Sequence, residues 1–215
     1  MSRNNQHTPY IWQEPEQKPY ALYIHGLGSS AKSGTKSSFG RYFDQYEWLS
    51  PEITHDPYES LDILNQWSDA FHPALVAGTS MGGMLTLYVN APDATKIAVN
   101  PTIEIEHVLR KLGYGKHPYL QERENGETEY IIDEQMIRRF ITFRDEHQIL
   151  SGSRNIALFS TDDELVGKEI SKRNAALLSQ LGWEILWSPK FGHRVNEQAV
   201  KAILQYMNNN KHSND

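Results

Sequence analysis

Short apolar runs alternate with segments whose apolar residues recur at helical spacing along most of the chain. In residues 195–207, Val195, Ala199, Ile203 and Met207 recur every four positions, which places them on one face of a helix. Strands are expected at residues 20–25, 47–50, 73–77, 96–100, 155–160 and 183–187, and helices at 39–46, 60–70, 81–89, 169–181 and 195–207. This alternation predicts an α/β fold, in which a mostly parallel sheet carries helices on both faces.

Composition and charge narrow the class of protein. The length of 215 residues suits a single domain, expected at residues 20–207 between a polar N-terminal segment, 1–19, and a polar tail, 208–215. The net charge of −6 and the lack of a Lys/Arg cluster argue against nucleic acid and anionic membranes as partners. The chain has no cysteine, which excludes disulfides, cysteine-bound zinc and thiol chemistry. It begins without an apolar leader and has no apolar run long enough to span a membrane, so a cytoplasmic location is expected.

The segment Gly78-Thr-Ser-Met-Gly82 is the most specific chemical signal in this pattern. It fits G-x-S-x-G, the nucleophile elbow, and it joins an expected strand to an expected helix. The backbone approaches itself closely in such a turn, so side chains two positions before and after the serine would collide, and Gly78 and Gly82 avoid this. The turn presents Ser80 to a base that can remove its proton, which makes Ser80 the candidate nucleophile. The alternative is a glycine-rich turn in which the serine has no chemical role.

Two later segments supply candidates for the acid and the base of a triad, in the chain order Ser, acid, His of α/β hydrolases. The expected strand 155–160 is followed by Thr161-Asp-Asp-Glu164, and one of its carboxylates is expected to orient an imidazole. His193 follows the last expected strand and precedes the last helix, so it is the candidate base. The alternatives are a polar turn that caps the next helix and a histidine with an ordinary surface role.

An oxyanion hole requires two backbone N–H groups. One is expected from Met81, the residue after the candidate nucleophile. The other is expected from Leu27, in the loop that follows the first strand, where His25 is expected to brace the loop rather than act as a base. A phosphate-binding loop is the alternative for this segment, but it lacks the Walker lysine and the G-x-G-x-x-G spacing.

Residues 102–153 interrupt the alternation, because they separate two expected strands where one helix would be enough. Apolar residues at helical spacing near 105–112 and 136–143, the latter with Asp133 as an expected N-cap, flank Asn125-Gly126, a pair typical of hairpin turns. Two interpretations are open. The stretch is either a small cap over the catalytic face, or two peripheral helices joined by a longer loop.

Several segments occur together in a known family. They are Tyr23-Ile-His-Gly-Leu-Gly-Ser-Ser30, Gly78-Thr-Ser-Met-Gly-Gly83, Val99-Asn-Pro-Thr102, His117-Pro-Tyr119, Gly126, Glu129-Tyr130, Thr161-Asp-Asp-Glu-Leu-Val166 and Gly192-His193. In their order and spacing the chain resembles the small α/β-hydrolase-fold esterases of the YqiA/YcfP (UPF0227) family. The resemblance implies an α/β-hydrolase-like sheet and an esterase reaction, without naming a substrate. The family pattern near the acid resembles T-G-D-E-V, which implies Asp163 as the acid, although Asp162 stands where that pattern has glycine.

These residues predict a serine hydrolase that cleaves carboxylic esters, or thioesters, of a small or medium acyl group through an acyl-serine intermediate. The expected catalytic residues are Ser80, Asp163 and His193, and the expected oxyanion donors are the N–H groups of Leu27 and Met81. A small-molecule ester is the expected partner, no metal or organic cofactor is implied, and no oligomeric state is predicted. One alternative is a hydrolase-fold protein kept for binding or regulation with weak or no turnover, and another is acyl transfer to an alcohol other than water.

Overall fold

The computed structural model of the protein describes residues 17–210, and residues 1–16 and 211–215 of the expected polar end segments lie outside this range. Its centre is a six-stranded sheet in the order β2-β1-β3-β4-β7-β8, and every neighbouring pair is parallel. The strands are β1 (Tyr20–Ile24), β2 (Glu47–Leu49), β3 (Leu75–Thr79), β4 (Thr95–Val99), β7 (Arg154–Ser160) and β8 (Glu184–Ser188). All six strands expected from the sequence are therefore confirmed, with shifts of one or two residues at their ends.

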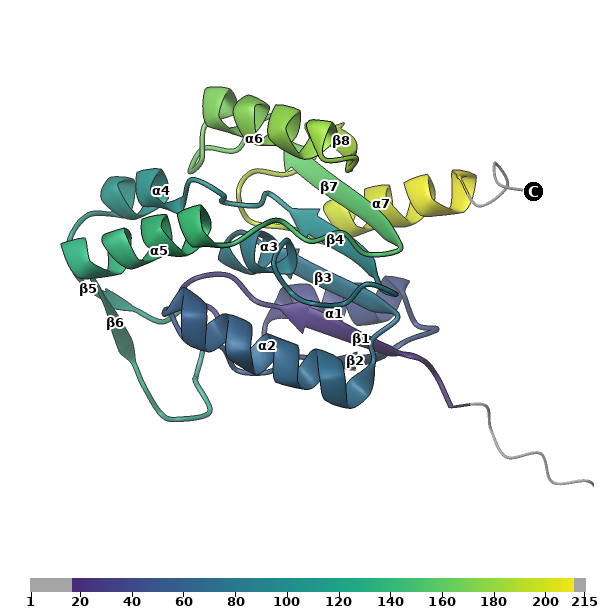
Figure 1. The fold of residues 1–215 in the computed structure, drawn as a ribbon, viewed down its shortest axis with the longest axis horizontal. Coiled ribbons are helices and arrows are strands. Elements are labelled where there is room, and N and C mark those ends of the chain that lie inside the picture. The colour runs from purple at the N-terminus through teal and green to yellow at the C-terminus, as the bar shows by residue number, and fades with distance from the viewer. Residues whose placement is uncertain (1–16, 211–215) are drawn as a thin grey trace, which may run out of the picture.

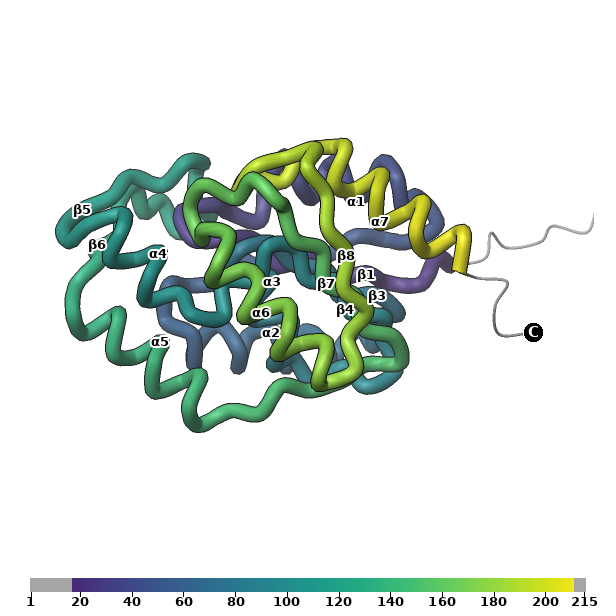
Figure 2. Tube along the Cα trace, turned by 90° about the horizontal axis from the view of Figure 1, so that it is seen from above, coloured from purple at the N-terminus to yellow at the C-terminus, as the bar shows by residue number. Residues whose placement is uncertain are grey.

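Helices cover both faces of the sheet, as the α/β prediction requires (Figure 2). Alternate residues of β1 point to opposite faces, so Ala21 and Tyr23 belong to one apolar core and Leu22 and Ile24 to the other. The first core is closed by α1 (Gly34–Tyr42) and α7 (Glu197–Asn209), which pack against each other. The second core is closed by α2 (Pro57–Phe71), α3 (Met81–Thr86) and α6 (Lys168–Gln180).

Capping residues set helix boundaries that differ from those expected. Helix α2 begins at Pro57 rather than at Ser60, because the Asp56 carboxylate accepts hydrogen bonds from two backbone N–H groups of the first turn. Ser60 lies inside this helix, and its hydroxyl donates to the carbonyl of Thr54 at 2.8 Å. Helix α1 begins five residues before the expected start, where the Ser33 hydroxyl caps it, and α3 ends at Thr86 instead of Val89.

The stretch 102–153 contains two helices and a separate antiparallel pair of strands. These elements are α4 (Ile105–Leu112), β5 (Gly115–Pro118), β6 (Glu129–Ile132) and α5 (Glu134–Glu146). Asp133 caps α5 as expected, and its carboxylate accepts from the Met136 N–H at 2.7 Å. The pair Asn125-Gly126 lies in the loop 119–128 that joins β5 to β6, which is longer than a tight hairpin turn. Figure 1 shows these elements at the end of the molecule toward which the strands of the large sheet point.

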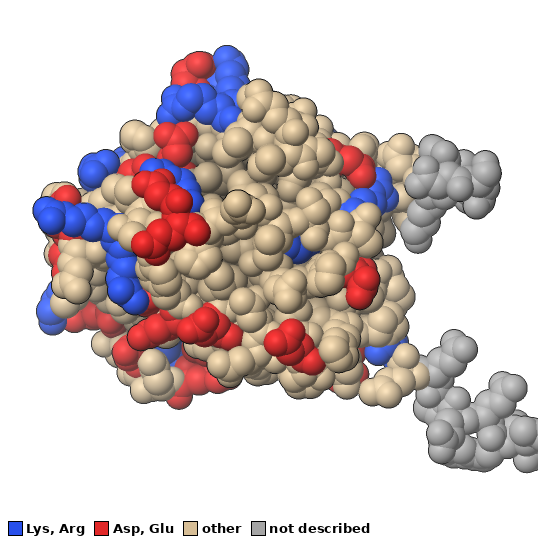
Figure 3. All heavy atoms as spheres, in the orientation of Figure 1, with Lys and Arg blue, Asp and Glu red and all other residues tan. Residues whose placement is uncertain are grey.

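Charged side chains are spread unevenly over the surface. On the face drawn in Figure 3, Lys and Arg are mixed with Asp and Glu near the β5–β6 end, and acidic side chains gather over the region of α2. Within residues 17–210, no helix combines the length and the apolar character needed to cross a membrane.

Candidate active site

Ser80 occupies a strained turn between β3 and α3. Its backbone has φ 57° and ψ −120°, a conformation that non-glycine residues rarely adopt and that is typical of functional turns. A Cβ atom on Gly78 would lie 2.2 Å from the carbonyl oxygen of Gly82, and one on Gly82 would lie 2.2 Å from that of Ile24. The two glycines therefore permit the close backbone approach that holds the Ser80 hydroxyl above the ends of the strands.

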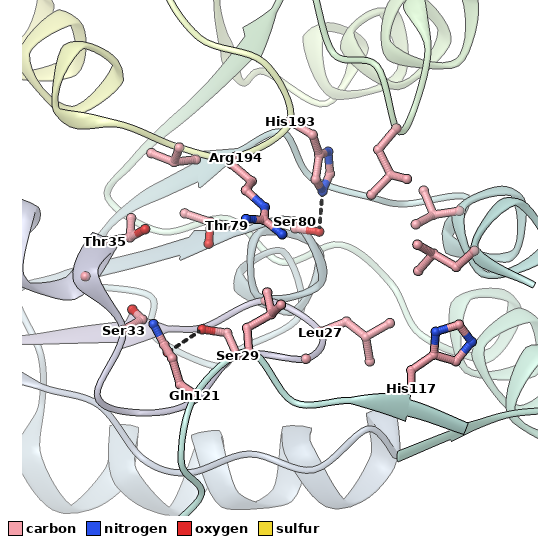
Figure 4. Close-up of a pocket in the computed structure, with 18 of the residues that line it drawn as sticks. Leu27, Ser29, Ser33, Thr35, Thr79, Ser80, His117, Gln121, His193 and Arg194 are labelled. Atoms are coloured by element: carbon pink, nitrogen blue, oxygen red, sulfur yellow. Dashed lines mark hydrogen bonds between the residues drawn. The ribbon is translucent and has the colours of Figure 1, made fainter. Parts of the chain in front are cut away.

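Ser80, His193 and Asp163 form a continuous hydrogen-bonded chain, although they are far apart in the sequence. The Ser80 Oγ lies 2.9 Å from His193 Nε2 (Figure 4), and His193 Nδ1 lies 2.9 Å from Asp163 Oδ2 and 3.1 Å from Oδ1. A carboxylate only accepts hydrogen bonds, so Nδ1 carries the proton and Nε2 is left to accept from the serine hydroxyl. This is the tautomer in which an imidazole can remove a proton from Ser80.

The structure brings Asp163, and not its neighbour Asp162, to the imidazole. Asp163 is 6% exposed, and its Oδ1 also accepts from the backbone N–H groups of Leu165 and Val166. Burial alone would raise the pKa of the Asp163 carboxyl, but the hydrogen bond from His193, the charge that this imidazole carries when protonated and the two N–H donors outweigh it and lower that pKa. Asp162 is exposed, and its backbone N–H donates to the Ser160 hydroxyl. The Asp163 carboxylate is therefore held ionised beside the ring.

Two residues outside the expected catalytic set hold the loop that carries His193. The buried Asn100, at the end of β4, donates from Nδ2 to the carbonyls of Gly192 and His193 and accepts from the Ser160 N–H with Oδ1. The Glu164 carboxylate, one of the three adjacent candidate acids, accepts from the His193 N–H at 2.9 Å. Asn100 also has a positive φ of 44°, a conformation that asparagine adopts more readily than most residues. No local pattern could have revealed these contacts, because they join separate strand ends.

The two expected oxyanion donors lie beside the serine. Leu27 lines the cavity in front of Ser80, and Met81 is the first residue of α3. Within residues 17–210, the backbone N–H groups of Leu27 and Met81 donate to no protein acceptor. His25 braces the loop, as predicted: its ring is 1% exposed, with Nδ1 3.0 Å from the Gly26 carbonyl and Nε2 3.0 Å from Glu52 Oε1. The loop is thus held from behind by His25, and Leu27 remains among the residues that line the cavity.

The loop 119–128 is also hydrogen-bonded to the segment that contains Leu27, a contact that no sequence pattern indicated. Arg123 is 4% exposed, its Nη1 lies 2.6 Å from Glu52 Oε1, and its guanidinium donates to the carbonyls of Ser29 and Ile53. The Leu120 N–H donates to the Gly28 carbonyl at 2.7 Å. The insertion is therefore tied directly to the loop that carries an expected oxyanion donor.

A cavity of about 700 Å³ opens in front of the Ser80 hydroxyl. It lies where the chain leaves β1, β3 and β8, and its far wall comes from α4 and the segment around β5. His117, which the sequence did not place near the site, lines this wall, stacks on Tyr130 and has its Nε2 2.9 Å from the Gly113 carbonyl. Among residues 17–210, no group of three or more His, Asp or Glu side chains is arranged to hold a metal ion.

Comparison with known proteins identifies the fold and the family. Est1E from Butyrivibrio proteoclasticus superposes with a TM-score of 0.66 at 17% identity, over 91% of this chain and 89% of that structure. Mouse alpha/beta hydrolase domain-containing protein 10 gives 0.63 at 11% identity, over 90% and 89% of the two chains. Paleococcus ferrophilus monoacylglycerol lipase gives 0.62 at 13% identity, over 89% and 95%. The fold is thus that of the α/β hydrolases.

Sequence comparison adds a result at the level of the protein family. None of the curated protein sequences matches this chain. A family model does match residues 20–207, and its description is an uncharacterised protein family, UPF0227. With the match spanning nearly all of the described structure, the chain belongs to the UPF0227 family.

Proposed function

We propose that this protein is a serine hydrolase that cleaves carboxylic esters or thioesters of small or medium acyl groups. The observation that carries the proposal is the chain from Ser80 Oγ to His193 Nε2 and from His193 Nδ1 to Asp163, with 2.9 Å at each step, at the wall of a large cavity. The α/β-hydrolase fold and its neighbours support it. Their names include esterases and a monoacylglycerol lipase, and Est1E has been solved with ferulic acid bound.

The first half of the proposed reaction forms an acyl-enzyme. Ser80 Oγ attacks the carbonyl carbon of the ester while His193 Nε2 takes the hydroxyl proton, and Asp163 stabilises the resulting imidazolium. The N–H groups of Leu27 and Met81 donate to the oxyanion of the tetrahedral intermediate. When the intermediate collapses, the bond from carbon to the leaving oxygen, or sulfur, breaks and the leaving group takes the proton from Nε2.

The second half releases the acid and restores the enzyme. A water molecule attacks the acyl carbon while His193 Nε2 accepts one of its protons, and collapse of the second intermediate returns that proton to Ser80 Oγ. In this proposal residues 102–153 act as a cap, because α4 and the segment around β5 supply the wall of the cavity opposite the triad. The hydrogen bonds from Arg123 and Leu120 to the segment 28–29 would hold this cap in a fixed position relative to the oxyanion donor.

The test is the loss of activity and of covalent labelling in Ser80→Ala. Removing a triad nucleophile leaves only the rate due to binding and the oxyanion hole, so hydrolysis of p-nitrophenyl butanoate should fall on the order of 10⁴-fold or more. A fluorophosphonate probe should label the wild type at Ser80 and should not label Ser80→Ala. Ser37→Ala, an exposed serine on α1, is the matched control and should behave as wild type. An Ala variant that keeps several per cent of the activity would show that Ser80 is not the nucleophile, and a wild type without activity or labelling would favour a binding or regulatory role.

A further inference from the structure

The cavity has two ends of different polarity. Apolar side chains of α4 and of the segment around β5 line one end, and among these Leu112 and Leu120 are 39% and 61% exposed. Side chains with hydroxyl, amide or guanidinium groups line the other end, namely Ser29, Ser33, Thr35, Gln121 and Arg194. Figure 4 shows Arg194, Thr35 and Ser33 on one side of the Ser80–His193 pair and His117 on the opposite side.

Arg194 gives the polar end a positive charge, and this exposed side chain has no carboxylate within 4.0 Å among residues 17–210. Of the described residues that line the cavity, it is the only one with a permanent charge, and none is Asp or Glu. Arginines elsewhere in residues 17–210 commonly pair with a carboxylate within 4.0 Å, as Arg41, Arg144 and Arg154 do, whereas Arg194 forms no such pair in that part of the chain. This absence is notable because the chain as a whole carries a net charge of −6.

The position of Arg194 is set by the catalytic loop itself. It directly follows His193, whose backbone is held by Asn100 and Glu164. In Figure 4 its guanidinium extends over the cavity beside Thr79 and Ser80. A guanidinium presents a rigid fork of N–H donors that matches the oxygens of a carboxylate or a phosphate. An anion at the polar end would therefore meet the Arg194 guanidinium, whose backbone attachment is held in place.

We propose that Arg194 binds an anionic group, a carboxylate or a phosphate, on the alcohol part of the substrate. This inference rests on the ester hydrolysis proposed above. In this proposal the substrate carries an apolar acyl chain, which packs against Val108, Leu112 and Leu120, because burial of apolar surface there is favourable. The leaving oxygen must reach His193 Nε2 to be protonated, and the group attached to it then extends toward the next residue, Arg194. The preferred substrates are therefore esters whose alcohol carries negative charge.

The test compares two esters of equal size that differ in charge. They are 4-carboxyphenyl butanoate and its neutral counterpart 4-carbamoylphenyl butanoate, with 4-phosphonooxyphenyl butanoate as a third substrate that separates phosphate from carboxylate recognition. The readout is the ratio of kcat/KM on each anionic ester to kcat/KM on the neutral one. Because the ratio is compared between variants, the intrinsic reactivity of each ester cancels. Arg194→Gln should lower the ratio about tenfold, mainly through KM, as expected for the loss of a charge-assisted hydrogen bond in a partly solvated site.

Two further variants make the result specific. Arg194→Lys keeps the charge but not the fork, so it should recover part of the ratio. Lys190→Gln removes the same charge from the same loop at a residue that does not line the cavity, and it should leave the ratio as in wild type. Added salt should lower the wild-type ratio and should hardly change that of Arg194→Gln.

The outcomes separate this inference from the proposed function. Equal loss on all esters in Arg194→Gln, or an equal change of the ratio in Lys190→Gln, would overturn the inference and leave ester hydrolysis intact. The inference would also be overturned, with ester hydrolysis intact, if the wild type hydrolysed the neutral ester through Ser80 and had the same kcat/KM ratio as Arg194→Gln. Failure of the wild type to hydrolyse any of the esters would refute the proposed function and this inference with it.

Discussion

Replacing Arg123 by methionine should destabilise the protein and weaken catalysis at the same time. The Arg123 side chain is 3% exposed, and its partner Glu52 is 13% exposed. Methionine fills a similar volume but removes the ion pair and the hydrogen bonds to the carbonyls of Ser29 and Ile53, at 3.1 and 2.7 Å. The change would take the guanidinium away from a nearly buried carboxylate, which keeps His25 and the Ala31 N–H as partners, and would leave two carbonyls without their donor.

The size of the effect follows from the loss of this buried ion pair. Removing one partner of a buried ion pair costs about 3–5 kcal/mol. Water retains some access to Glu52, so we expect the lower end of that range, about 3 kcal/mol. For a chain of this size, 1 kcal/mol corresponds to about 2–4 °C, so Tm should fall by about 6–12 °C.

The pH dependence of this loss provides a second measure. Burial would raise the pKa of the Glu52 carboxyl, but the hydrogen bond from His25 and the charges of His25 and Arg123 lower it overall. A carboxyl whose folded-state pKa is lowered contributes stability above its ordinary pKa, near 4.3, and loses it as the pH falls through the lowered value. The difference in unfolding free energy between wild type and Arg123→Met should therefore be full at pH 7 and should shrink below about pH 4.3.

The assay is urea unfolding, with ester hydrolysis measured on the same preparations. Arg138→Met is the matched control: Arg138 is 75% exposed and pairs with Glu134 at 3.4 Å, so its loss should cost less than about 0.5 kcal/mol. The double variant Arg123→Met, Glu52→Gln should recover part of the stability, because it removes the buried charge that has lost its arginine partner. Activity should fall mainly in kcat, because Ser29 lies two residues from the expected donor Leu27. A loss below about 1 kcal/mol, equal to that of Arg138→Met, would refute the reasoning that this cluster is buried and coupled.

Three other predictions follow from single residues. Asp163→Asn should cost on the order of 10³–10⁴ in kcat, because an amide favours the wrong imidazole tautomer, and Asp162→Asn should cost far less; steady-state kinetics with the reverse order would reassign the acid. Gly82→Ala should lower stability by at least about 1–3 kcal/mol and reduce esterase activity, because its Cβ would lie 2.2 Å from a backbone oxygen, whereas Gly40→Ala, with its nearest contact at 3.7 Å, should be neutral or stabilising in thermal unfolding. Lys96 is fully buried, and burial lowers its pKa from 10.5 to about 8, so the unfolded chain binds more protons between these values and the unfolding free energy should rise with pH across that window. Lys96→Met should lose this rise, and parallel pH curves for the two proteins would contradict the assignment.

Much of the architecture could be predicted from the sequence because it is encoded by near neighbours. A strand is recognised from a short apolar run and a helix from the spacing of its apolar face, and both signals lie within about ten residues. All six strands of the sheet were predicted in this way. The elbow at Ser80 was predictable for the same reason, because the two glycines that it needs are only two positions away. The placing of Ser80, one carboxylate of residues 162–164 and His193 at one edge of the sheet also follows from the alternation, because parallel strands bring their carboxyl ends to the same edge.

Some local features were predicted wrongly because several residues compete for the same role. Ser60 and Asp56 are both good N-caps. Only the structure shows that Asp56 caps the helix and that Pro57 is its first residue. The residues alone also left the choice among three adjacent carboxylates open. Adjacent side chains leave the backbone in different directions, so the path of the loop decides that Asp163 faces His193 and that Glu164 holds the histidine backbone.

The rest was decided by contacts between distant parts of the chain. The strand order β2-β1-β3-β4-β7-β8 and the bonds from Asn100 to the His193 loop depend on which strand ends meet. The hydrogen bond from Arg123 to the Ser29 carbonyl depends on how the insertion lies over the sheet. The position of the Arg194 charge in the cavity depends on the path of the last loop. Sequence determined the elements and the chemical groups because hydrophobic period and turn chemistry are local properties. Only the tertiary structure decided the partners of those groups, because hydrogen bonding and burial depend on residues that come together when the chain folds.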